Sequence, residues 1–258
     1  MPITSPIVSW IGGKRRLAAQ LLPLFPPHTC YVELFCGGAA LYFLREKAAK
    51  VEVINDSNGE LTNLYRVVQH HPDEFMRQFT WGLSSRTAFR WQQMTPPETL
   101  TDIERAARFY FLQQHAFGGR VASHSFGTAT TTPSVNFSRL EEKLRAAHHR
   151  LAGTFIENLP WQECMRLYDR PHTFFYADPP YWKMEGYGVP FGIEQYEELA
   201  EFMRTCKGKV LLSINDHPDM RRIFAGFPMK ELTVKYSLGN NFSKSATVGE
   251  LAVWNWGR

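Results

Sequence analysis

The chain has 258 residues, of which 44% are hydrophobic and 21% charged, a balance typical of one large globular domain or of one domain with an insert. The formal net charge of +4 is compatible with a polyanionic partner but identifies none. No apolar run approaches the roughly 20 residues that a membrane-spanning helix needs, and the N-terminus lacks a signal-peptide pattern. A cytoplasmic protein without membrane contact is therefore expected.

The spacing of the cysteines and histidines indicates whether disulfides or a metal site are expected. The four cysteines are scattered and form no Cys-x-x-Cys pair, so reduced thiols are expected rather than a disulfide framework or a zinc site. The pairs His70–His71 and His148–His149 are adjacent in sequence and cannot face one ligand from a helix. We interpret them as surface residues and expect no metal.

A glycine turn comes first in the chain, within Trp10-Ile11-Gly12-Gly13-Lys14. Basic and apolar residues at helical spacing follow, so the turn is predicted to enter a short helix. Glycines at such a turn let backbone N–H groups approach a ligand closely. The spacing of a phosphate-binding P-loop is absent, however, and taken alone the pattern favours an ordinary helix start over a binding site.

Two strands separated by a glycine turn and a helix are predicted next. Residues 30–35 form a β-rich run, Gly37 and Gly38 supply the turn, and residues 51–56 form a second strand that ends in Asp56. This is the first half of a Rossmann-like unit, in which an acid about 18 residues after the turn is placed to bind ribose hydroxyls. The full dinucleotide pattern is missing, which favours a smaller adenosine-containing ligand. As a single residue, Asp56 is also explained as a helix N-cap.

Between residues 57 and 150 the alternation of strands and helices stops, and apolar spacing predicts a mostly helical insert. The insert contains 11 Lys and Arg against 8 Asp and Glu, so most of the positive excess of the chain lies there. Within it, a polar loop runs from Phe117 past Arg120 to Asn136 and could meet phosphates and base edges. A solvated surface loop explains the same residues equally well.

An unusual corner, Asp178-Pro179-Pro180-Tyr181, follows a predicted buried strand at residues 173–175. Two prolines have no N–H groups to continue a ladder, so they form a rigid turn whose carbonyl groups are free acceptors. Together with a carboxylate and a flat aromatic ring, this corner could hold an amino group on a planar ring. The alternative is a plain strand exit with a buried tyrosine.

The rest of the chain returns to alternating strands and helices. Strands are predicted at residues 154–158, 209–214, 230–236 and 250–256, and helices at 194–206 and 217–224. This pattern predicts a three-layer α/β fold with a mostly parallel sheet. Because ligands of such sheets bind beyond the carboxyl ends of strands, the glycine turn, Asp56, Asn158 and Asp178 are expected at one edge. There, Asn158 could touch an adenine, and a polar connection that contains Asn240 and Lys244 could contact a ligand.

Four motifs in this order resemble the Dam-like N6-adenine DNA methyltransferases, and the resemblance covers nearly the whole chain. They are Trp10-x-Gly12-Gly13-Lys14, Glu33-x-Phe35-x-Gly37-Gly38, Asp56-x-Asn58 and Asp178-Pro179-Pro180-Tyr181. Residues 213–217 and 236–254 are most similar to phage or prophage members. The resemblance implies S-adenosylmethionine as methyl donor without a metal, and a Rossmann-like methyltransferase fold. It also implies a catalytic domain of residues 1–56 and 151–258 around a helical target-recognition insert of residues 57–150.

The resemblance assigns roles residue by residue. Donor contacts would come from Trp10, Gly12, Gly13, Lys14, Glu33, Phe35, Gly37, Gly38, Asp56, Asn158 and Asp178. Asp178 and the Pro179 carbonyl would accept the two N6–H bonds of an adenine, Pro180 would complete the corner, and Tyr181 would stack on the ring. Contacts to double-stranded DNA, out of which the adenine must flip, would come from Arg120, Asn136, Asn240 and Lys244. The transfer would be direct and in line, without a covalent intermediate or a cysteine.

The chain also departs from the family pattern. Where many relatives carry Phe-Asn-Gly and then Phe-Asn-Val-Pro-Phe-Gly, this chain has Phe117-Gly118-Gly119 and a threonine-rich stretch that ends at Asn136. No target sequence therefore follows. Rival hypotheses are methylation of cytosine N4, whose enzymes more often carry Ser in place of Asp178, methylation of RNA, and a DNA-binding protein that has lost catalysis. A restriction–modification role and a phage role both remain open, and a monomer suffices for the chemistry.

Overall fold

The strands that carry the predicted motifs lie at the centre of one sheet. The computed structural model describes residues 5–8, 10, 12–80, 85–116, 137–184, 191–235 and 247–257. Strands β1 (Cys30–Glu33) and β4 (Thr173–Ala177) are buried at every position, as expected for parallel strands covered on both faces. They pair with each other, and this pairing places Glu33 beside Tyr176, two residues before Asp178.

Seven strands form this sheet in the order β3-β2-β1-β4-β5-β7-β6. The remaining strands are β2 (Val51–Asn55), β3 (Thr154–Glu157), β5 (Lys209–Asn215), β6 (Met229–Lys235) and β7 (Thr247–Trp254). All neighbours are parallel except at β7, which runs antiparallel to both β5 and β6. The expected Rossmann-like α/β fold with a mostly parallel sheet is confirmed.

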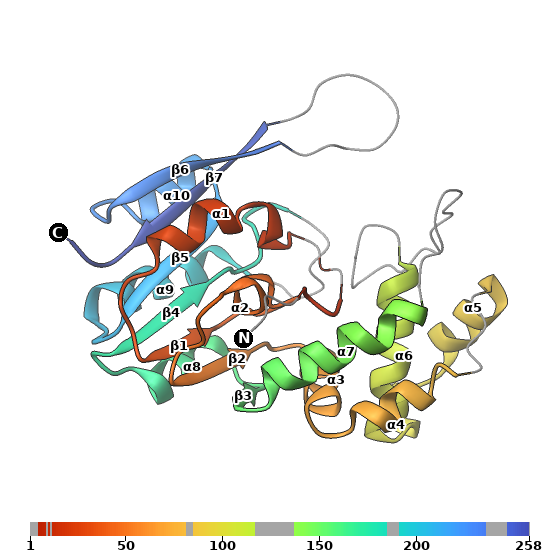
Figure 1. Ribbon diagram of the computed structural model, residues 1–258. Helices are drawn as coiled ribbons and strands as arrows, with labels where there is room; N and C mark the ends of the chain where they lie inside the picture. Colours follow the sequence, from red (N-terminus) through yellow and green to blue (C-terminus); the bar gives the residue numbers. More distant parts are fainter. Residues whose placement is uncertain are drawn as a thin grey trace.

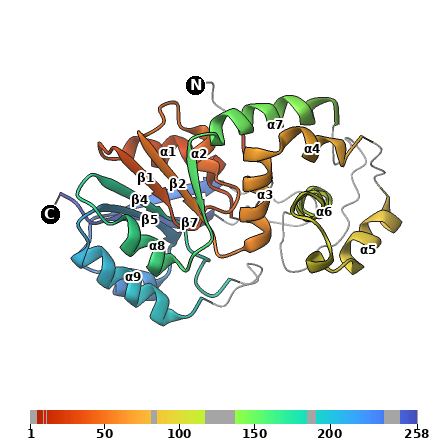
Figure 2. The same cartoon turned by 90° about the horizontal axis from the view of Figure 1, so that it is seen from below.

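Helices cover both faces of the sheet and complete three layers (Figure 2). One face carries the 3₁₀ turns η1 (Lys14–Arg16) and η2 (Leu22–Leu24) with the short helices α1 (Ala18–Leu21) and α2 (Ala40–Leu44). The other carries α8 (Trp161–Tyr168), α9 (Ile193–Thr205) and α10 (Pro218–Ile223). Alternate residues of β4 serve the two faces, because Phe174 packs into one hydrophobic cluster and Phe175 into the other.

Between β2 and β3 the described residues form only helices, which gather beside the sheet (Figure 1). They are α3 (Gly59–His70), α4 (Pro72–Arg77), α5 (Arg86–Met94), the 3₁₀ turn η3 (Pro97–Thr99), α6 (Asp102–His115) and α7 (Phe137–Leu151). Side-chain caps start three of them, and at α5 the Ser85 hydroxyl accepts from the Ala88 N–H group. Asn58 accepts from the N–H groups of Glu60 and Leu61 at the start of α3, and Thr101 opens a capping box at α6.

The helical segment is not separated from the sheet by a gap in the core. One hydrophobic cluster extends from the α1–α2 face of the sheet through α3 to α4, α6 and α7. Within the described ranges, none of the helices has the length and apolar character needed to cross a membrane. The division into a catalytic domain and an insert at residues 57–150 stays a prediction.

Candidate active site

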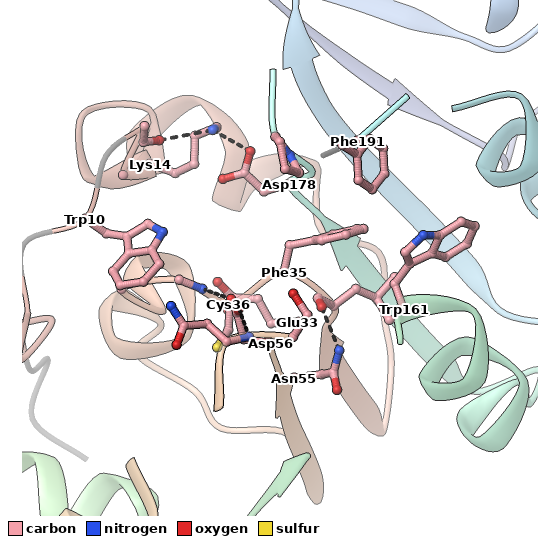
Figure 3. Close-up of a pocket in the computed structure, with 18 of the residues that line it drawn as sticks. Trp10, Lys14, Glu33, Phe35, Cys36, Asn55, Asp56, Trp161, Asp178 and Phe191 are labelled. Atoms are coloured by element: carbon pink, nitrogen blue, oxygen red, sulfur yellow. Dashed lines mark hydrogen bonds and ion pairs between the residues drawn. The ribbon is translucent and has the colours of Figure 1, made fainter. Parts of the chain in front are cut away.

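The candidate site lies where the direction of the chain through the sheet reverses. From β1 the chain moves outward through β2 to β3, and it then crosses back to continue on the other side with β4 and β5. Parallel α/β sheets bind ligands at this switch point, beyond the carboxyl ends of the strands. Here the segments after β1 and β4 border a cavity of about 250 Å³ (Figure 3).

The turn after β1 forms one wall of the cavity together with Trp10. Gly37 has φ +47°, and a Cβ atom there would lie 2.6 Å from Cδ1 of Trp10, so only glycine fits without displacing the indole. The Gly37 N–H donates to Oδ2 of Asp56 at 2.9 Å, and the Asn58 N–H donates to Oδ1 at 2.9 Å. Burial raises the pKa of Asp56, while these two N–H groups oppose the shift. The turn therefore fixes both an aromatic wall and a carboxylate.

Lys14 and Asp178 form the opposite wall (Figure 3). The Lys14 ammonium is 4% exposed and lies 2.5 Å from Oδ1 of Asp178 and 3.1 Å from the Gly12 carbonyl oxygen. The Ser213 hydroxyl also faces Oδ1, at 3.4 Å, whereas Oδ2 has no hydrogen-bond partner among the described residues. One oxygen of this carboxylate is thus held by the protein and the other stays available.

The pKa values of both members of this ion pair, Lys14 and Asp178, are shifted from their ordinary values. Burial raises the pKa of Asp178 to about 6, against the lowering effect of the Lys14 ammonium. Burial alone would lower the pKa of Lys14, but the carboxylates of Asp178 and Glu250 raise it above its ordinary value. At neutral pH the lysine is therefore a permanent cation and the aspartate is an acceptor.

The proline corner continues from Asp178. The Pro180 carbonyl accepts a hydrogen bond from the Tyr196 hydroxyl, whereas the Pro179 carbonyl accepts none among the described residues. The Tyr181 ring is buried, lies 4.6 Å from the Lys14 ammonium, and its hydroxyl donates to Glu250. The corner thus has one carbonyl oxygen and one carboxylate oxygen without a hydrogen-bond partner among the described residues.

Glu33, at the end of β1, adds a third carboxyl group to the cavity wall, after Asp56 and Asp178. It is 3% exposed, and one of its oxygens accepts from the Tyr31 hydroxyl at 2.9 Å and from the Tyr42 N–H at 3.1 Å. Burial raises its pKa to about 8. Cys36 also lines the cavity, but burial raises the pKa of its thiol well above the ordinary value, so it is a poor nucleophile.

The structure brings most of the predicted donor residues together around one cavity. It is lined by Trp10, Gly12, Gly13, Lys14, Glu33, Phe35, Gly37, Gly38, Asp56 and Asp178, and by Pro180 of the corner. Asn158, Pro179 and Tyr181 do not line it, and the Asn158 amide donates to the Asp56 carbonyl at 2.7 Å. The roles assigned to these residues stay predictions. Arg120, Asn136, Asn240 and Lys244, predicted to contact DNA, lie outside the described residues.

Several lining residues escaped the sequence reasoning. Asn55 donates to the carbonyl groups of Leu34 and Leu159 and so ties β1 to the segment after β3. Trp161 closes the far side of the cavity and donates to Gln195 at 2.9 Å. Their one available signal was position, since polar and aromatic residues that directly follow parallel strands lie at the ligand edge. In the described part of the chain, no cluster of three or more His, Cys, Asp or Glu side chains could hold a metal ion.

Comparison with known proteins agrees with this geometry. A sequence model of the D12 class N6 adenine-specific DNA methyltransferases matches residues 10–238. The Type II methyltransferase M.CviBI of Paramecium bursaria Chlorella virus NC1A is 27% identical over 241 residues, which cover 90% of each chain. The DNA adenine methylase of Haemophilus influenzae is 24% identical over 266 residues, or 95% of this chain and 92% of the relative.

A phage protein is among the relatives. The DNA N-6-adenine-methyltransferase of Escherichia phage P1 is 24% identical over 262 residues, which cover 90% of this chain and 33% of the relative. The resemblance drawn from the four motifs, including its phage character, is confirmed. Because the family match spans most of the chain and contains every motif that lines the cavity, the chain belongs to the D12 class N6 adenine-specific DNA methyltransferases and is a DNA adenine methyltransferase.

Proposed function

We propose that the chain transfers a methyl group from S-adenosylmethionine to the N6 amino group of an adenine flipped out of double-stranded DNA. One observation carries the proposal. At the carboxyl end of β4, Oδ2 of Asp178 and the Pro179 carbonyl are hydrogen-bond acceptors without partners among the described residues. An exocyclic amino group has two N–H bonds and requires two such acceptors.

The cavity fits the methyl donor. S-adenosylmethionine combines an adenosine with a cationic amino acid, and the cavity offers aromatic walls at Trp10 and Phe35 with carboxyl groups at Glu33 and Asp56. Asp56 lies at the end of β2, where an acid binds ribose hydroxyls. The glycine turn leaves no side chain at Gly37, whose missing Cβ gives room to the Trp10 indole. We assign these four side chains and the turn to donor binding.

The residues of the corner would activate a weak nucleophile. The lone pair of the adenine N6 is conjugated with the ring, and hydrogen bonds from both N–H groups to Asp178 and Pro179 localise it on the nitrogen. The donor supplies a methyl group on a sulfonium, which is a good leaving group. N6 would bond to the methyl carbon as the carbon–sulfur bond breaks and a neutral thioether leaves, and the Asp178 carboxylate would stabilise the positive charge on nitrogen until a proton leaves to solvent. Lys14 keeps Asp178 oriented and ionised at neutral pH.

The wider assignments follow from this function. We propose that residues 57–150 recognise the DNA, with Arg120 and Asn136 in the insert and Asn240 and Lys244 before β7 as contacts. We propose that residues 1–56 and 151–258 hold donor and adenine, and that a monomer in the bacterial cytoplasm carries out the reaction. Flipping the adenine costs a few kcal/mol of stacking and pairing, which the closed pocket around the base would offset.

The proposal is tested by single-molecule sequencing of unmethylated DNA after incubation with the protein and S-adenosylmethionine. Asp178→Ala is treated in parallel. We expect N6-methyladenine in one sequence context with the wild-type protein and unmodified DNA with the variant. N4-methylcytosine in place of N6-methyladenine, or methylation of RNA alone, would contradict the proposed substrate.

A further inference from the structure

Glu250 is a buried carboxylate beside the proposed adenine site that the mechanism above does not use. It lies on β7, is 2% exposed, and precedes the fully buried run Leu251–Val253. Its Oε2 accepts the Tyr181 hydroxyl. Its Oε1 is buried without a hydrogen-bond partner among the described residues and lies 3.6 Å from the Lys14 ammonium. A buried charge with an unpaired oxygen is costly, so its presence calls for a reason.

Lys14 connects Glu250 to the acceptor carboxylate. A lysine ammonium has three N–H bonds. Two hydrogen bonds are formed, to the Gly12 carbonyl at 3.1 Å and to Oδ1 of Asp178 at 2.5 Å, and Oε1 of Glu250 lies 3.6 Å from the same nitrogen. The ammonium is thereby confined between two carboxylates, and its position decides where Asp178 points.

The neighbouring strand β5 holds Trp182, the residue that follows Tyr181, by hydrogen bonds from one side chain. Asn215 of β5 pairs with Glu250 across the sheet. Its Oδ1 accepts from the Trp182 N–H at 3.0 Å, and its Nδ2 donates to the Trp182 carbonyl at 3.2 Å. Two paired residues on β5 and β7 therefore hold two successive residues after the proline corner. This arrangement fixes the direction in which the corner leaves the sheet.

We propose that Glu250 is a positioning residue for methyl transfer: it fixes the Tyr181 ring through the hydroxyl and the Asp178 carboxylate through the Lys14 ammonium. The inference rests on the proposed function and adds to it a residue outside the four motifs. Glu250 touches neither the adenine nor the donor in this account, since it does not line the cavity. Its effect is on geometry, to which transfer rates are sensitive.

The test compares Glu250→Gln with the wild-type protein in single-turnover methylation at saturating DNA and donor. Glutamine keeps an acceptor for the Tyr181 hydroxyl but removes the charge that confines Lys14. We expect the rate to fall about tenfold to a hundredfold. We expect the dissociation constants of DNA and donor to change less than about threefold, since the lost interaction acts on the transfer step.

The pH profile separates positioning from a loss of folded protein. The groups that act on Asp178 are Lys14, Glu250, Tyr176, Ser213 and the Glu33 carboxyl on the same cavity. Because Glu250 raises the pKa of Asp178, removing its charge lowers that pKa. The rate falls as pH drops through the pKa of Asp178, so the acid limb, near pH 6 in the wild type, moves to lower pH in Glu250→Gln. A merely structural role would leave the limb in place.

Glu52→Gln is the matched control, because Glu52 is also a buried glutamate in an ion pair on the same sheet, but its partners are Arg45 and Arg150 rather than Lys14. We expect this control to keep the wild-type rate per folded molecule. A Glu250→Gln rate equal to that of the wild type, with an unmoved acid limb, would overturn the inference. If the wild-type protein itself leaves adenine unmethylated, the proposed function fails instead, and the two failures are thereby distinguished.

Tyr181→Phe examines the same contact from the other side, since it removes the hydroxyl and keeps the ring. If Glu250 acts through that hydroxyl, the double variant with Glu250→Gln loses less rate than the product of the two single losses. Multiplicative losses would refute this half of the inference. Should Glu250→Gln fail to fold, Tyr181→Phe alone decides: a lower rate at unchanged donor affinity supports the inference, and an unchanged rate overturns it.

Discussion

Two buried clusters of charged side chains in this protein have opposite arrangements of charge. They also differ in whether every carboxylate oxygen is hydrogen-bonded within the protein. In one, the Glu52 carboxylate lies between the guanidinium groups of Arg45 and Arg150, and both of its oxygens accept hydrogen bonds from them. In the other, the Lys14 ammonium lies between the carboxylates of Asp178 and Glu250. The first contributes nothing to the lining of the cavity, whereas Lys14 and Asp178 form part of its wall.

The difference indicates that the Glu52 cluster stabilises the fold and that the Lys14 cluster can also bind a substrate. The guanidinium groups around Glu52 are covered by the rings of Tyr31 and Tyr42, each 3.8 Å away, and the central carboxylate is saturated. Around Lys14, by contrast, Asp178 keeps one oxygen without a partner among the described residues. A carboxylate whose two oxygens are both bonded inside the protein can only hold the fold together, whereas an acceptor left open at a cavity can bind a substrate.

The largest effect is expected from Asp178→Ala, which removes the open acceptor. Single-turnover methylation of adenine should fall by about a hundredfold to a thousandfold, the usual cost of removing one group that stabilises charge in the transition state. DNA affinity should change little, because the DNA contacts that we propose lie in other segments of the chain. Glu201→Ala, at an exposed carboxylate on α9, is the control and should retain the wild-type rate. An Asp178→Ala variant with more than half of that rate would contradict the assignment.

Glu52→Gln is expected to lower the stability of the protein and to leave the methylation rate unchanged. Removing one charge from a buried cluster leaves its partners unpaired, and the free energy of unfolding should fall by about 3 kcal/mol. The methylation rate per folded molecule should stay at the wild-type value, because none of the three side chains lines the cavity. Urea unfolding and single-turnover assays on the same preparation measure both quantities. A loss of rate without a loss of stability would remove the distinction between the clusters.

Gly37→Ala tests whether the turn after β1 and the Trp10 indole bind the methyl donor. The new Cβ would lie 2.6 Å from the Trp10 ring, so the indole must move, and we expect the dissociation constant of the donor to rise about tenfold, or 1.4 kcal/mol. Gly226→Ala is a matched control, since Gly226 also has a positive φ, +86°, but nothing lies within 4 Å of its missing Cβ. Both variants carry backbone strain, but calorimetry should show weaker donor binding in Gly37→Ala only.

The smallest effect concerns pH and Glu33. With a pKa of about 8, this carboxyl is mostly protonated in the free protein at neutral pH, and the cationic amino group of the donor should lower that pKa. Binding then releases protons, and donor affinity should rise about fivefold between pH 7 and pH 8. Calorimetry in two buffers of different ionisation enthalpy measures the release. Glu33→Gln should abolish it, and equal heats for the wild type in both buffers would show that Glu33 does not face the amino group.

Much of the fold was predictable because local patterns carried it. The apolar strands, the turn at Gly37 and the acid at Asp56 each have a local signature, and their order along the chain predicts a parallel sheet with one ligand edge. The expected strands match β1 to β7 with ends displaced by a few residues. The ends were less predictable because hydrogen bonding across the sheet, rather than propensity, decides where a strand stops.

The parts of the site that escaped prediction depend on contacts between distant residues. Glu250 meets Lys14 and Tyr181 only because β7 inserts between β5 and β6, and no local pattern encodes that insertion. A signal did exist, since a glutamate that begins a buried apolar run is unusual. For Asn158 the position at the end of β3 was predictable, but the direction of its side chain was not. Its amide donates a hydrogen bond to the Asp56 carbonyl.

The most direct test follows a labelled methyl group from S-adenosylmethionine into DNA and identifies the modified nucleoside after digestion. Wild-type protein, Asp178→Ala and Glu52→Gln are assayed in parallel. We expect the label in N6-methyladenine with the wild type and with Glu52→Gln, and initial labelling about a hundredfold to a thousandfold slower with Asp178→Ala. Label in N4-methylcytosine, or equal labelling by wild type and Asp178→Ala, would contradict the claim that the Lys14–Asp178 cluster carries out adenine methylation.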